Sequence, residues 1–236
     1  MEEEMMGRGQ LWKLSFGQNG WGHSESATMN GSFINNDRFT PNMRHFIRPF
    51  NEPMFSLSNA PHNGGLFKAN GFFFMMVHKN YSGDYKADCL KFEQENGLNN
   101  FVGFMTAANI EKVLAVSRSG SVTAYITAGV TNPAIAGEVP PPWKPGTINM
   151  ALVIEDGLTV GAMANAIMTA TEAKTYTLLR LGYNATGTTS DGIGVFAFEG
   201  EKEWAGTATE LGINIGRAVR KALEESLGKW KSSRKG

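Results

Sequence analysis

Strand-like apolar segments outnumber helical segments in this chain of 236 residues, and several of them follow one another without a helix between them. Strands that are adjacent in sequence can pair directly, whereas a regular alternation of strands and helices would indicate a parallel sheet. Helical periodicity is expected in only three places: residues 84–95, residues 160–181 and residues 208–227. The pattern therefore predicts an α+β fold, with a mixed or largely antiparallel sheet packed with two long helices and one shorter helix.

The expected strands contain two candidate hairpins. His45–Phe50 and Met54–Leu57 are apolar-alternating runs separated by Asn51-Glu-Pro53, and residues 113–117 and 122–128 are separated by a short turn. The other expected strands are residues 71–78, 148–154 and 193–198.

Capping residues mark the ends of the helical segments. Asp84 and Thr159 can accept hydrogen bonds from the first free N–H groups of their helices. Thr207 and Glu210 have the spacing of a capping box, in which each side chain bonds to the other's backbone N–H. Gly228 is expected to end the last helix.

The chain is predicted to form one domain, flanked by a different kind of segment at each end. Residues 1–43 are rich in Gly, Asn and Ser and lack helical periodicity, so they are interpreted as an irregular extension that can include a short strand. Residues 44–228 contain the regular elements and form the single domain. Residues 229–236 are interpreted as a basic, solvated tail.

Composition excludes several classes of protein. Basic and acidic residues balance at 22 each, which argues against a nucleic-acid-binding protein. Cys89 is the single cysteine, so neither a disulfide framework nor a cysteine zinc site is expected. No apolar stretch reaches the roughly 20 residues of a membrane span, and residues 1–6 do not resemble a signal peptide. A cytoplasmic protein without membrane contact is therefore expected.

Short clusters of Gly, Thr and Asn stand at the edges of apolar segments in the second half of the chain. Glycine lets the backbone approach a ligand closely, and small hydroxyl and amide groups supply hydrogen bonds without bulk. The clusters are residues 129–133, 146–149, 185–191 and 205–209. They predict one polar pocket rimmed by loops, suited to a large, amide-rich small molecule.

Glu172 lies on a polar stripe of the first long helix, at three- to four-residue spacing from Asn165, Thr169 and Tyr176. The helix has few charges, so it is expected to be mostly covered, and Glu172 is predicted to line the pocket. The alternative is a structural pair between Glu172 and a buried basic group. Lys174 lies about 200° around the helix from Glu172 and is interpreted as a snorkelling or ion-paired core lysine.

Several loop residues have both a structural and a functional interpretation. Asp191, at the start of a strand, either forms an Asx-turn or provides a carboxylate to the site. Asn63, Asn132 and Asn149 either form turns or bind the amides of a ligand. Thr207 either caps its helix or belongs to a helix N-terminus that polarises a carbonyl group.

Motifs for a metal or a nucleotide are missing. The histidines His23, His45, His62 and His78 show neither i,i+4 spacing nor an accompanying carboxylate. The sequence also contains no Walker, Rossmann or Gly-x-Ser-x-Gly motif. Neither a metal ion nor a cofactor is expected.

Taken in order, the clusters resemble the adenosylcobinamide amidohydrolase family over roughly residues 45–223. The segments that carry this resemblance are Leu57-Ser-Asn-Ala-Pro-His-Asn-Gly-Gly65, Gly103-Phe-Met-Thr-Ala-Ala-Asn109, Thr127-Ala-Gly-Val-Thr-Asn-Pro133, Pro145-Gly-Thr-Ile-Asn149, Ala170-Thr-Glu-Ala-Lys-Thr175, Ala185-Thr-Gly-Thr188 and Ala205-Gly-Thr-Ala-Thr-Glu-Leu-Gly212. Two positions depart from the family pattern: the run Thr186-Gly-Thr-Thr-Ser-Asp191 and Ala208, where relatives often have histidine.

The resemblance implies hydrolysis of the amide that joins cobyric acid to its aminopropanol arm, in the salvage of cobinamide for cobalamin synthesis. A corrinoid is then the expected small-molecule partner, and a homo-oligomer remains open. Two alternatives are kept: a corrinoid-binding protein without catalysis, which the two departures favour, and an amidase for an unrelated amide.

Amide hydrolysis needs a nucleophile, a proton shuttle and donors for the oxyanion. Glu172 or Asp191 is the expected general acid/base, and Thr188 or Thr207 is the expected nucleophile or a donor beside an activated water. The expected substrate-binding residues are Asn63, Gly64, Gly65, Thr127, Asn132, Thr147, Asn149, Thr186 and Lys174.

Overall fold

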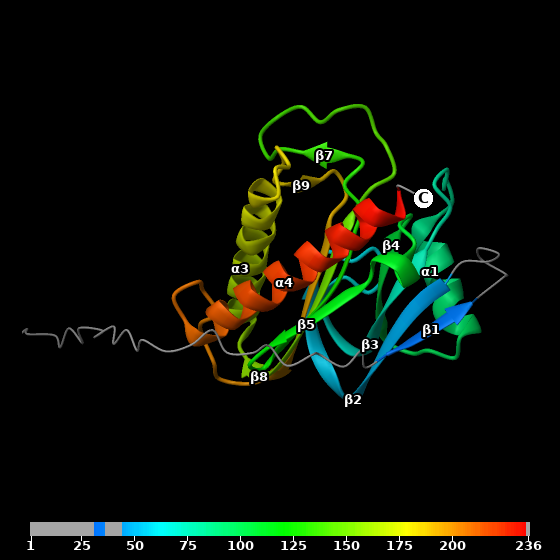
Figure 1. The fold of residues 1–236 in the computed structure, drawn as a ribbon. Coiled ribbons are helices and arrows are strands. Elements are labelled where there is room, and N and C mark those ends of the chain that lie inside the picture. Colours follow the sequence, from blue (N-terminus) through cyan, green and yellow to red (C-terminus); the bar gives the residue numbers. More distant parts are fainter. Residues whose placement is uncertain (1–30, 36–43, 235–236) are drawn as a thin grey trace, which may run out of the picture.

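The computed structural model describes residues 31–35 and 44–234, and this part of the chain has the predicted α+β fold (Figure 1). Its elements, in chain order, are β1 (Ser32–Asn35), β2 (Arg44–Ser58), β3 (Gly65–Met76), α1 (Tyr85–Glu95), β4 (Phe101–Thr106), α2 (Ile110–Val113), β5 (Ala115–Ser119), β6 (Val122–Ala128), β7 (Pro133–Ala134), β8 (Ile148–Leu158), α3 (Val160–Arg180), β9 (Gly187–Thr188), β10 (Gly192–Glu199) and α4 (Glu210–Ser233). The short strand expected in the N-terminal segment is β1, and residues 1–30 and 36–43 of that segment lie outside the described residues.

The main sheet of the described chain is mixed, with the strand order β4-β3-β2-β10-β8-β6-β5 and β1 paired to β2. The pairs β3/β4 and β8/β10 are parallel, and the other pairs are antiparallel. The strands β5 and β6 form the predicted hairpin. A separate two-stranded sheet joins β7 to β9 above the end of the main sheet (Figure 1).

The hairpin predicted for residues 45–57 is wrong, because β2 is one continuous strand. Its register against β3 shifts between Pro49 and Met54, so the segment with Asn51 and Pro53 forms an irregularity within the strand instead of reversing the chain. Proline lacks the N–H that a regular ladder requires, and a bulge accommodates it as well as a turn does. Local sequence could not distinguish these outcomes.

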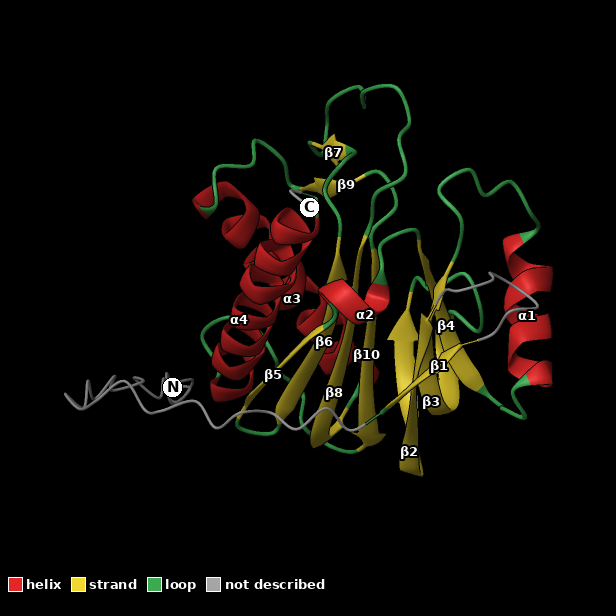
Figure 2. Cartoon of the chain, turned by 45° about the vertical axis from the view of Figure 1, so that its right-hand side comes forward, coloured by secondary structure: helices red, strands yellow, loops and turns green. Residues whose placement is uncertain are grey.

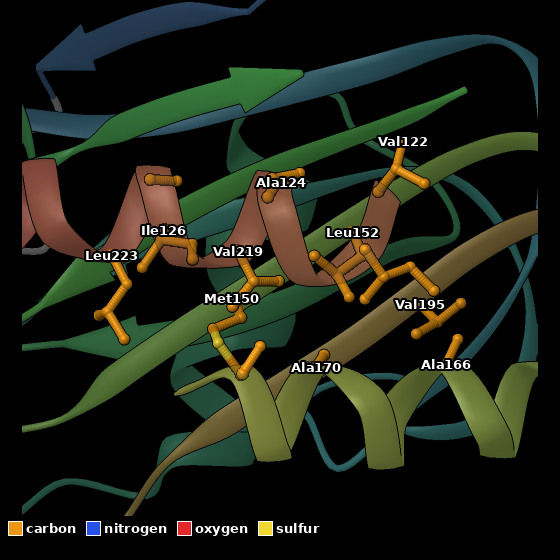
Figure 3. Packing of buried hydrophobic residues seen from close by; sticks show 14 of the residues in the cluster. Val122, Ala124, Ile126, Met150, Leu152, Ala166, Ala170, Val195, Val219 and Leu223 are labelled. Carbon is orange, nitrogen blue, oxygen red and sulfur yellow. The ribbon is translucent and has the colours of Figure 1, made fainter. Parts of the chain in front are cut away.

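Alternating side chains along the strands divide the interior into layers. On β8, Met150 and Leu152 face the helices α3 and α4, while Ala151 and Val153 face an aromatic core formed with β2, β3 and β4. Figure 3 shows Ala166 and Ala170 of α3, with Val219 and Leu223 of α4, packed on the first of these faces. The sheet is curled, since a Cβ added at Gly192 of β10 would lie 2.9 Å from the Phe104 ring of β4.

The helix α1 covers the opposite side of β3 and β4, far from α3 and α4 (Figure 2). Cys89 and Phe92 of α1 are buried against Phe73, Met75 and Phe101. The thiol is therefore part of the packed interior, and burial raises the pKa of Cys89 to about 12.

Two of the three predicted helix caps are confirmed. Asp84 accepts hydrogen bonds from the N–H groups of Lys86 and Ala87, and Thr159 accepts one from Ala162. The predicted capping box at Thr207 is wrong, because the cap of α4 is Thr209, whose hydroxyl accepts from Gly212 N at 2.9 Å.

The last helix also extends further than predicted. It passes through Gly228 and ends at Ser233, so most of the segment interpreted as a basic tail is helical. Glycine is only a weak helix breaker when neighbouring residues pack, and Leu227 is buried in the main core. None of the helices in the described ranges is both long and apolar enough to cross a membrane.

Candidate functional site

Most of the predicted site residues gather at one end of the main sheet, where β6 ends and β8 and β10 begin. Ala128 pairs with Ile148, and Asn149 pairs with Gly192, so the three strand ends are level. The side-chain amide of Asn149 donates to Met105 O at 2.8 Å, which brings the end of β4 to the same place. The loops that join these strands meet at this end (Figure 2).

Asp191, Lys174 and Thr188 form the centre of this site. The ammonium group of Lys174 lies 2.5 Å from Oδ2 of Asp191, and the hydroxyl of Thr188 donates to Oδ1 of Asp191 at 2.5 Å. Only 10% of the Lys174 side chain and 16% of the Asp191 side chain are exposed, so bulk water screens the pair weakly. The interpretation of Lys174 as an ion-paired core lysine is confirmed.

Backbone groups hold the Asp191 carboxylate in place. The N–H groups of Ile148 and Thr188 both donate to it at 3.1 Å, which ties the start of β8 to the loop between β9 and β10. Gly187 is required beside it, since an added Cβ would lie 2.7 Å from Nζ of Lys174 and still closer to the carboxylate. A smaller gap than 3.0 Å is essentially never seen for a real Cβ. The Asp191 carboxylate therefore has a fixed position, and no side chain at Gly187 separates it from Lys174 or Thr188.

The Thr and Asn residues around this centre differ in what they can offer to a ligand. Thr147 donates to Ser190 O at 2.7 Å, and Thr186 accepts from Ala136 N at 2.9 Å, so both hydroxyls bond within the protein. By contrast, Oγ1 of Thr127 and Oδ1 of Asn132 are buried and have no hydrogen-bond partner in the described chain. Unpaired buried polar atoms are costly, which marks these two as the polar groups with free bonding capacity.

Two predicted catalytic residues lie elsewhere. Glu172 is on the exposed side of α3, so its expected position in the pocket is wrong. Of the predicted stripe, Thr169 is buried and donates to Ala205 O, whereas Glu172 and Tyr176 are exposed. Small residues such as Ala166 and Ala170 provide much of the covered face. Thr207 is exposed in a turn before α4 and does not cap the helix.

Asn63, Gly64 and Gly65 line a surface hollow of about 600 Å³, together with the rest of residues 58–62, Lys86 and Leu90. Asn63 and Gly65 adopt left-handed backbone conformations, with φ of 52° and 86°. The hollow adjoins the Asp191 centre through Asn59, whose side-chain amide donates to Asp191 O at 2.9 Å and accepts from Ile193 N at 2.7 Å. The predicted binding residues thus fall into two neighbouring groups.

His62, at this hollow, is a candidate functional residue that the sequence did not indicate. Its Nε2 lies 2.9 Å from Oε2 of Glu93, and both side chains are 9% exposed. The available signal was weak: Glu93 is one helical turn after the buried Cys89, on the face of α1 that packs against the sheet. Nothing local connects that face to residue 62.

A second cavity, of about 780 Å³, borders the loops that join β6 to β8. Gly129, Thr131 and Gly146 belong to its wall, and the end of α4 contributes Trp230 and Arg234. Its remaining lining residues are Met76, Val77, His78, Lys79, Ala107, Ala108, Asn109, Lys112, Val113, Lys144, Pro145 and Ser233. The segment predicted to be a solvated tail therefore forms part of a cavity.

A hydroxyl on β9, a carboxylate in the loop before β10 and an ammonium group on α3, held in contact, are groups that a hydrolase of small molecules uses. Comparison with known proteins identifies the particular family. The sequence pattern described as adenosylcobinamide amidohydrolase matches residues 31–235, which is most of the chain. The chain therefore belongs to the adenosylcobinamide amidohydrolase family.

Two curated relatives have the same description. The adenosylcobinamide amidohydrolase of Methanosarcina mazei is 35% identical over 179 residues, which cover 70% of this chain and 86% of the relative. That of Halobacterium salinarum is 34% identical over 122 residues, which cover 48% of this chain and 52% of the relative. An uncharacterised protein of Methanocaldococcus jannaschii is 36% identical over 102 residues, 39% of this chain and 40% of that protein.

Proposed function

We propose that this protein hydrolyses the amide between cobyric acid and the aminopropanol arm of adenosylcobinamide, releasing adenosylcobyric acid and aminopropanol. Membership of the family supports the reaction, and the contact of Lys174, Asp191 and Thr188 at the loop-rich end of the sheet is the observation that carries it for this chain. Lysine, aspartate and threonine supply a cation, a proton acceptor and a nucleophile within one set of contacts.

In the first step, Oγ1 of Thr188 attacks the carbonyl carbon of the amide while its proton passes to Asp191, to which it already donates. The charge that develops on the amide oxygen is negative, and the Lys174 ammonium is the positive group beside the reacting atoms. The carbon–nitrogen bond then breaks, and the leaving amine takes the proton from Asp191. The products of this step are an ester of Thr188 and free aminopropanol.

In the second step, water attacks the ester. Asp191 accepts a proton from the water and returns it to Oγ1 of Thr188 as the carbon–oxygen bond breaks, which releases the corrinoid carboxylic acid. Lys174 keeps its proton throughout and holds the carboxylate of Asp191 in position. In the competing route, Thr188 only orients a water molecule, and no ester forms.

The corrinoid ring is too large for the Asp191 centre itself, so it has to lie on an adjoining surface. We assign it to the hollow lined by residues 58–65, because Asn59 belongs both to that hollow and to the contacts of Asp191. The amide side chains of the corrinoid then face Asn63 and the backbone at Gly64 and Gly65. Asn132 and Thr127, which have free bonding capacity, are the second group of candidate contacts.

The test is to incubate the protein with adenosylcobinamide and to measure cobyric acid and aminopropanol by chromatography. Release of both products supports the proposal. A corrinoid absorbance change without product would instead identify a corrinoid-binding protein, and turnover of simple amides but not of cobinamide would identify an unrelated amidase.

Matched variants test the assignment of residues. Thr188→Ala is expected to abolish ester formation, which hydroxylamine trapping and mass spectrometry detect, while Thr188→Ser retains it. Thr171→Ala removes an exposed α3 hydroxyl and serves as the control. If Thr188→Ala turns over at the wild-type rate, Thr188 is not the nucleophile.

The chain contains its own control for Asp191→Asn. Asp156 has the same kinds of partner, an ammonium from Lys202 at 2.8 Å and the hydroxyl of Ser121 at 2.5 Å, but it lies at the opposite end of β8. Loss of turnover in Asp191→Asn but not in Asp156→Asn is expected. Equal effects of the two substitutions would mean that both aspartates act only through stability.

A further inference from the structure

Positive side chains gather at the 780 Å³ cavity without any accompanying carboxylate. The described residues that line it include Lys79, Lys112, Lys144 and Arg234, but no aspartate or glutamate. The whole chain has equal numbers of basic and acidic residues, so this excess of positive charge is local. Like charges around one concave surface produce a positive potential that attracts anions.

These four side chains form no ion pair within residues 31–35 and 44–234. The lysines and arginines of this part of the chain that do pair with a carboxylate are Arg44, Arg118, Lys174, Arg180, Lys202 and Lys229. All four cavity cations are exposed, so a ligand can reach them. They follow β3, lie in α2, precede β8 and end α4, so four separate segments each contribute one positive charge to the same cavity.

Arg234 is held over an aromatic ring at the wall of this cavity. Its guanidinium carbon lies 4.9 Å from the centroid of the Trp230 ring, and a Cβ added at Gly129 would lie 3.2 Å from Nε1 of the same indole. Stacking orients the guanidinium plane without using its N–H groups, and no acceptor in the described chain bonds to them. An oriented guanidinium can bind a phosphate through two parallel hydrogen bonds.

The size of the cavity and its lining indicate the class of ligand. A volume of 780 Å³ is much larger than a single phosphate ion and is typical of sites for whole organic molecules. Adenosylcobinamide has amides in place of free carboxylates and contains no phosphate, so it offers these cations no anionic partner. Met76, Val77 and Trp230 add apolar surface to the wall, and a planar base can stack on the indole or on the guanidinium.

We infer that this cavity binds a nucleoside polyphosphate, whose phosphate groups pair with Arg234, Lys79, Lys112 and Lys144. The nucleotide is a second ligand, separate from the corrinoid in the hollow of residues 58–65. Binding of the nucleotide is independent of the proposed hydrolysis and can be measured without it.

The cavity also shares a loop with the Asp191 centre. The carbonyl of Gly146, in the cavity wall, accepts from Oγ of Ser190 at 3.3 Å, and the N–H of Ile148 donates to Asp191 at 3.1 Å. A nucleotide that contacts Lys144 therefore acts on the segment that holds the Asp191 carboxylate. The consequence, which rests on the proposed function, is that nucleotide changes the turnover of adenosylcobinamide on the order of 5-fold.

Calorimetric titration of the full-length protein with adenosine triphosphate, pyrophosphate and adenosine, in the presence of chelator, tests the binding. The triphosphate is expected to bind most tightly, pyrophosphate more weakly and adenosine not measurably. An increase in salt from about 0.05 M to about 0.5 M should weaken the binding, because the cations are exposed and screened. Failure of both phosphates to bind at low salt would overturn the inference. Equal binding of adenosine and the triphosphate would also overturn it, and would assign the cavity to the adenosyl group of the corrinoid.

Matched variants test the named side chains. Arg234→Ala and Lys112→Ala are each expected to weaken binding of the triphosphate by about 10-fold, the effect of losing a charge-assisted hydrogen bond. Arg220→Ala is the control, since its guanidinium also stacks on an aromatic ring, that of Tyr176 at 4.8 Å, and lies on α4 outside the cavity. Equal losses in Arg220→Ala and Arg234→Ala would mean that the triphosphate responds only to the overall charge of the helix, and would refute the site.

Titration in the presence of saturating cobinamide separates this site from the proposed active site. The triphosphate is expected to bind with cobinamide present, whereas complete competition would place the corrinoid in the cavity and overturn the inference. Binding of the triphosphate by a protein that releases no cobyric acid would support the nucleotide site and count against the proposed hydrolysis alone. Turnover that saturating triphosphate leaves unchanged would refute the coupling through Gly146.

Discussion

Substitution of Gly187 by alanine would test whether the Lys174–Asp191 contact has to keep its present geometry. Gly187 is buried in β9, and its φ lies outside the left-handed region, so the backbone accepts alanine. The change removes no functional group. It adds one methyl group that presses against both the Lys174 ammonium and the Asp191 carboxylate, which are 2.5 Å apart.

The size of the effect follows from the contact distances. The added Cβ would lie 2.7 Å from Nζ of Lys174, whereas ordinary van der Waals contact begins at 3.4 Å, so the ammonium has to move by about 0.7 Å. The carboxylate of Asp191 has to move further. A misplacement of about 1 Å in a catalytic group costs on the order of 100-fold in rate, and overpacking costs about 1–3 kcal/mol in stability.

The assay compares turnover of adenosylcobinamide with urea unfolding of the same preparations. Gly187→Ala is expected to lose on the order of 100-fold in kcat. It should stay folded, because the expected loss of stability is smaller than the free energy of unfolding of a typical domain. The control is Gly216→Ala on α4, where an added Cβ meets no atom within 4 Å. This variant should gain about 1 kcal/mol and keep full turnover.

The outcome that contradicts the reasoning is a folded Gly187→Ala protein with wild-type kcat. It would show that the ammonium and the carboxylate can separate without consequence, and the proposed proton transfer through Asp191 would have to be abandoned.

Three further predictions concern single residues. Burial lowers the pKa of His45 from 6.5 to about 4, so between these pH values the unfolded chain binds a proton that the folded chain excludes. On acidification from about pH 7 to about pH 4.5, the free energy of unfolding measured in urea should therefore fall by about 2 kcal/mol more in the wild type than in His45→Asn. An equal fall in both proteins would argue against His45 as the origin. Thr209→Ala should cost about 1 kcal/mol in thermal unfolding by removing the cap of α4, while Thr207→Ala should cost less than about 0.5 kcal/mol; the reverse order would restore the capping box at Thr207. Glu172→Gln should leave cobyric acid formation unchanged, since Glu172 is exposed; a large loss of turnover would return it to the site.

Local signals in the sequence predicted much of the fold. Asp84 and Thr159 cap their helices through hydrogen bonds to residues two or three positions away, so short sequence windows contain the whole interaction. The β5–β6 hairpin is equally local. The continuous course of β2 depends instead on pairing with β3 and β10, and a window around Pro53 does not contain that information.

The site was predictable in its parts but not in its assembly. Asp191, Thr188 and Lys174 were each identified as candidates, yet their contact depends on how α3 packs beside β9. His62 and Glu93 are separated by 31 positions and belong to a loop and a helix that meet only through the sheet. A low charge count predicts that α3 is mostly covered, but it does not show where the covered face ends, and that boundary falls between the buried Thr169 and the exposed Glu172.

The position of β2 in the middle of the sheet determines the order in which a nascent chain can become active. The ribosome completes β1, β2 and β3 long before it produces β10, so the part of β2 that pairs with β10, Phe55–Ser58, remains an unpaired edge during synthesis, and such edges recruit other chains. Docking of β10 closes this edge, and the same event lets Asn59 bond to Asp191 and Ile193. Catalytic competence and protection from aggregation therefore arise together, and a chain that ends before residue 199 should have neither.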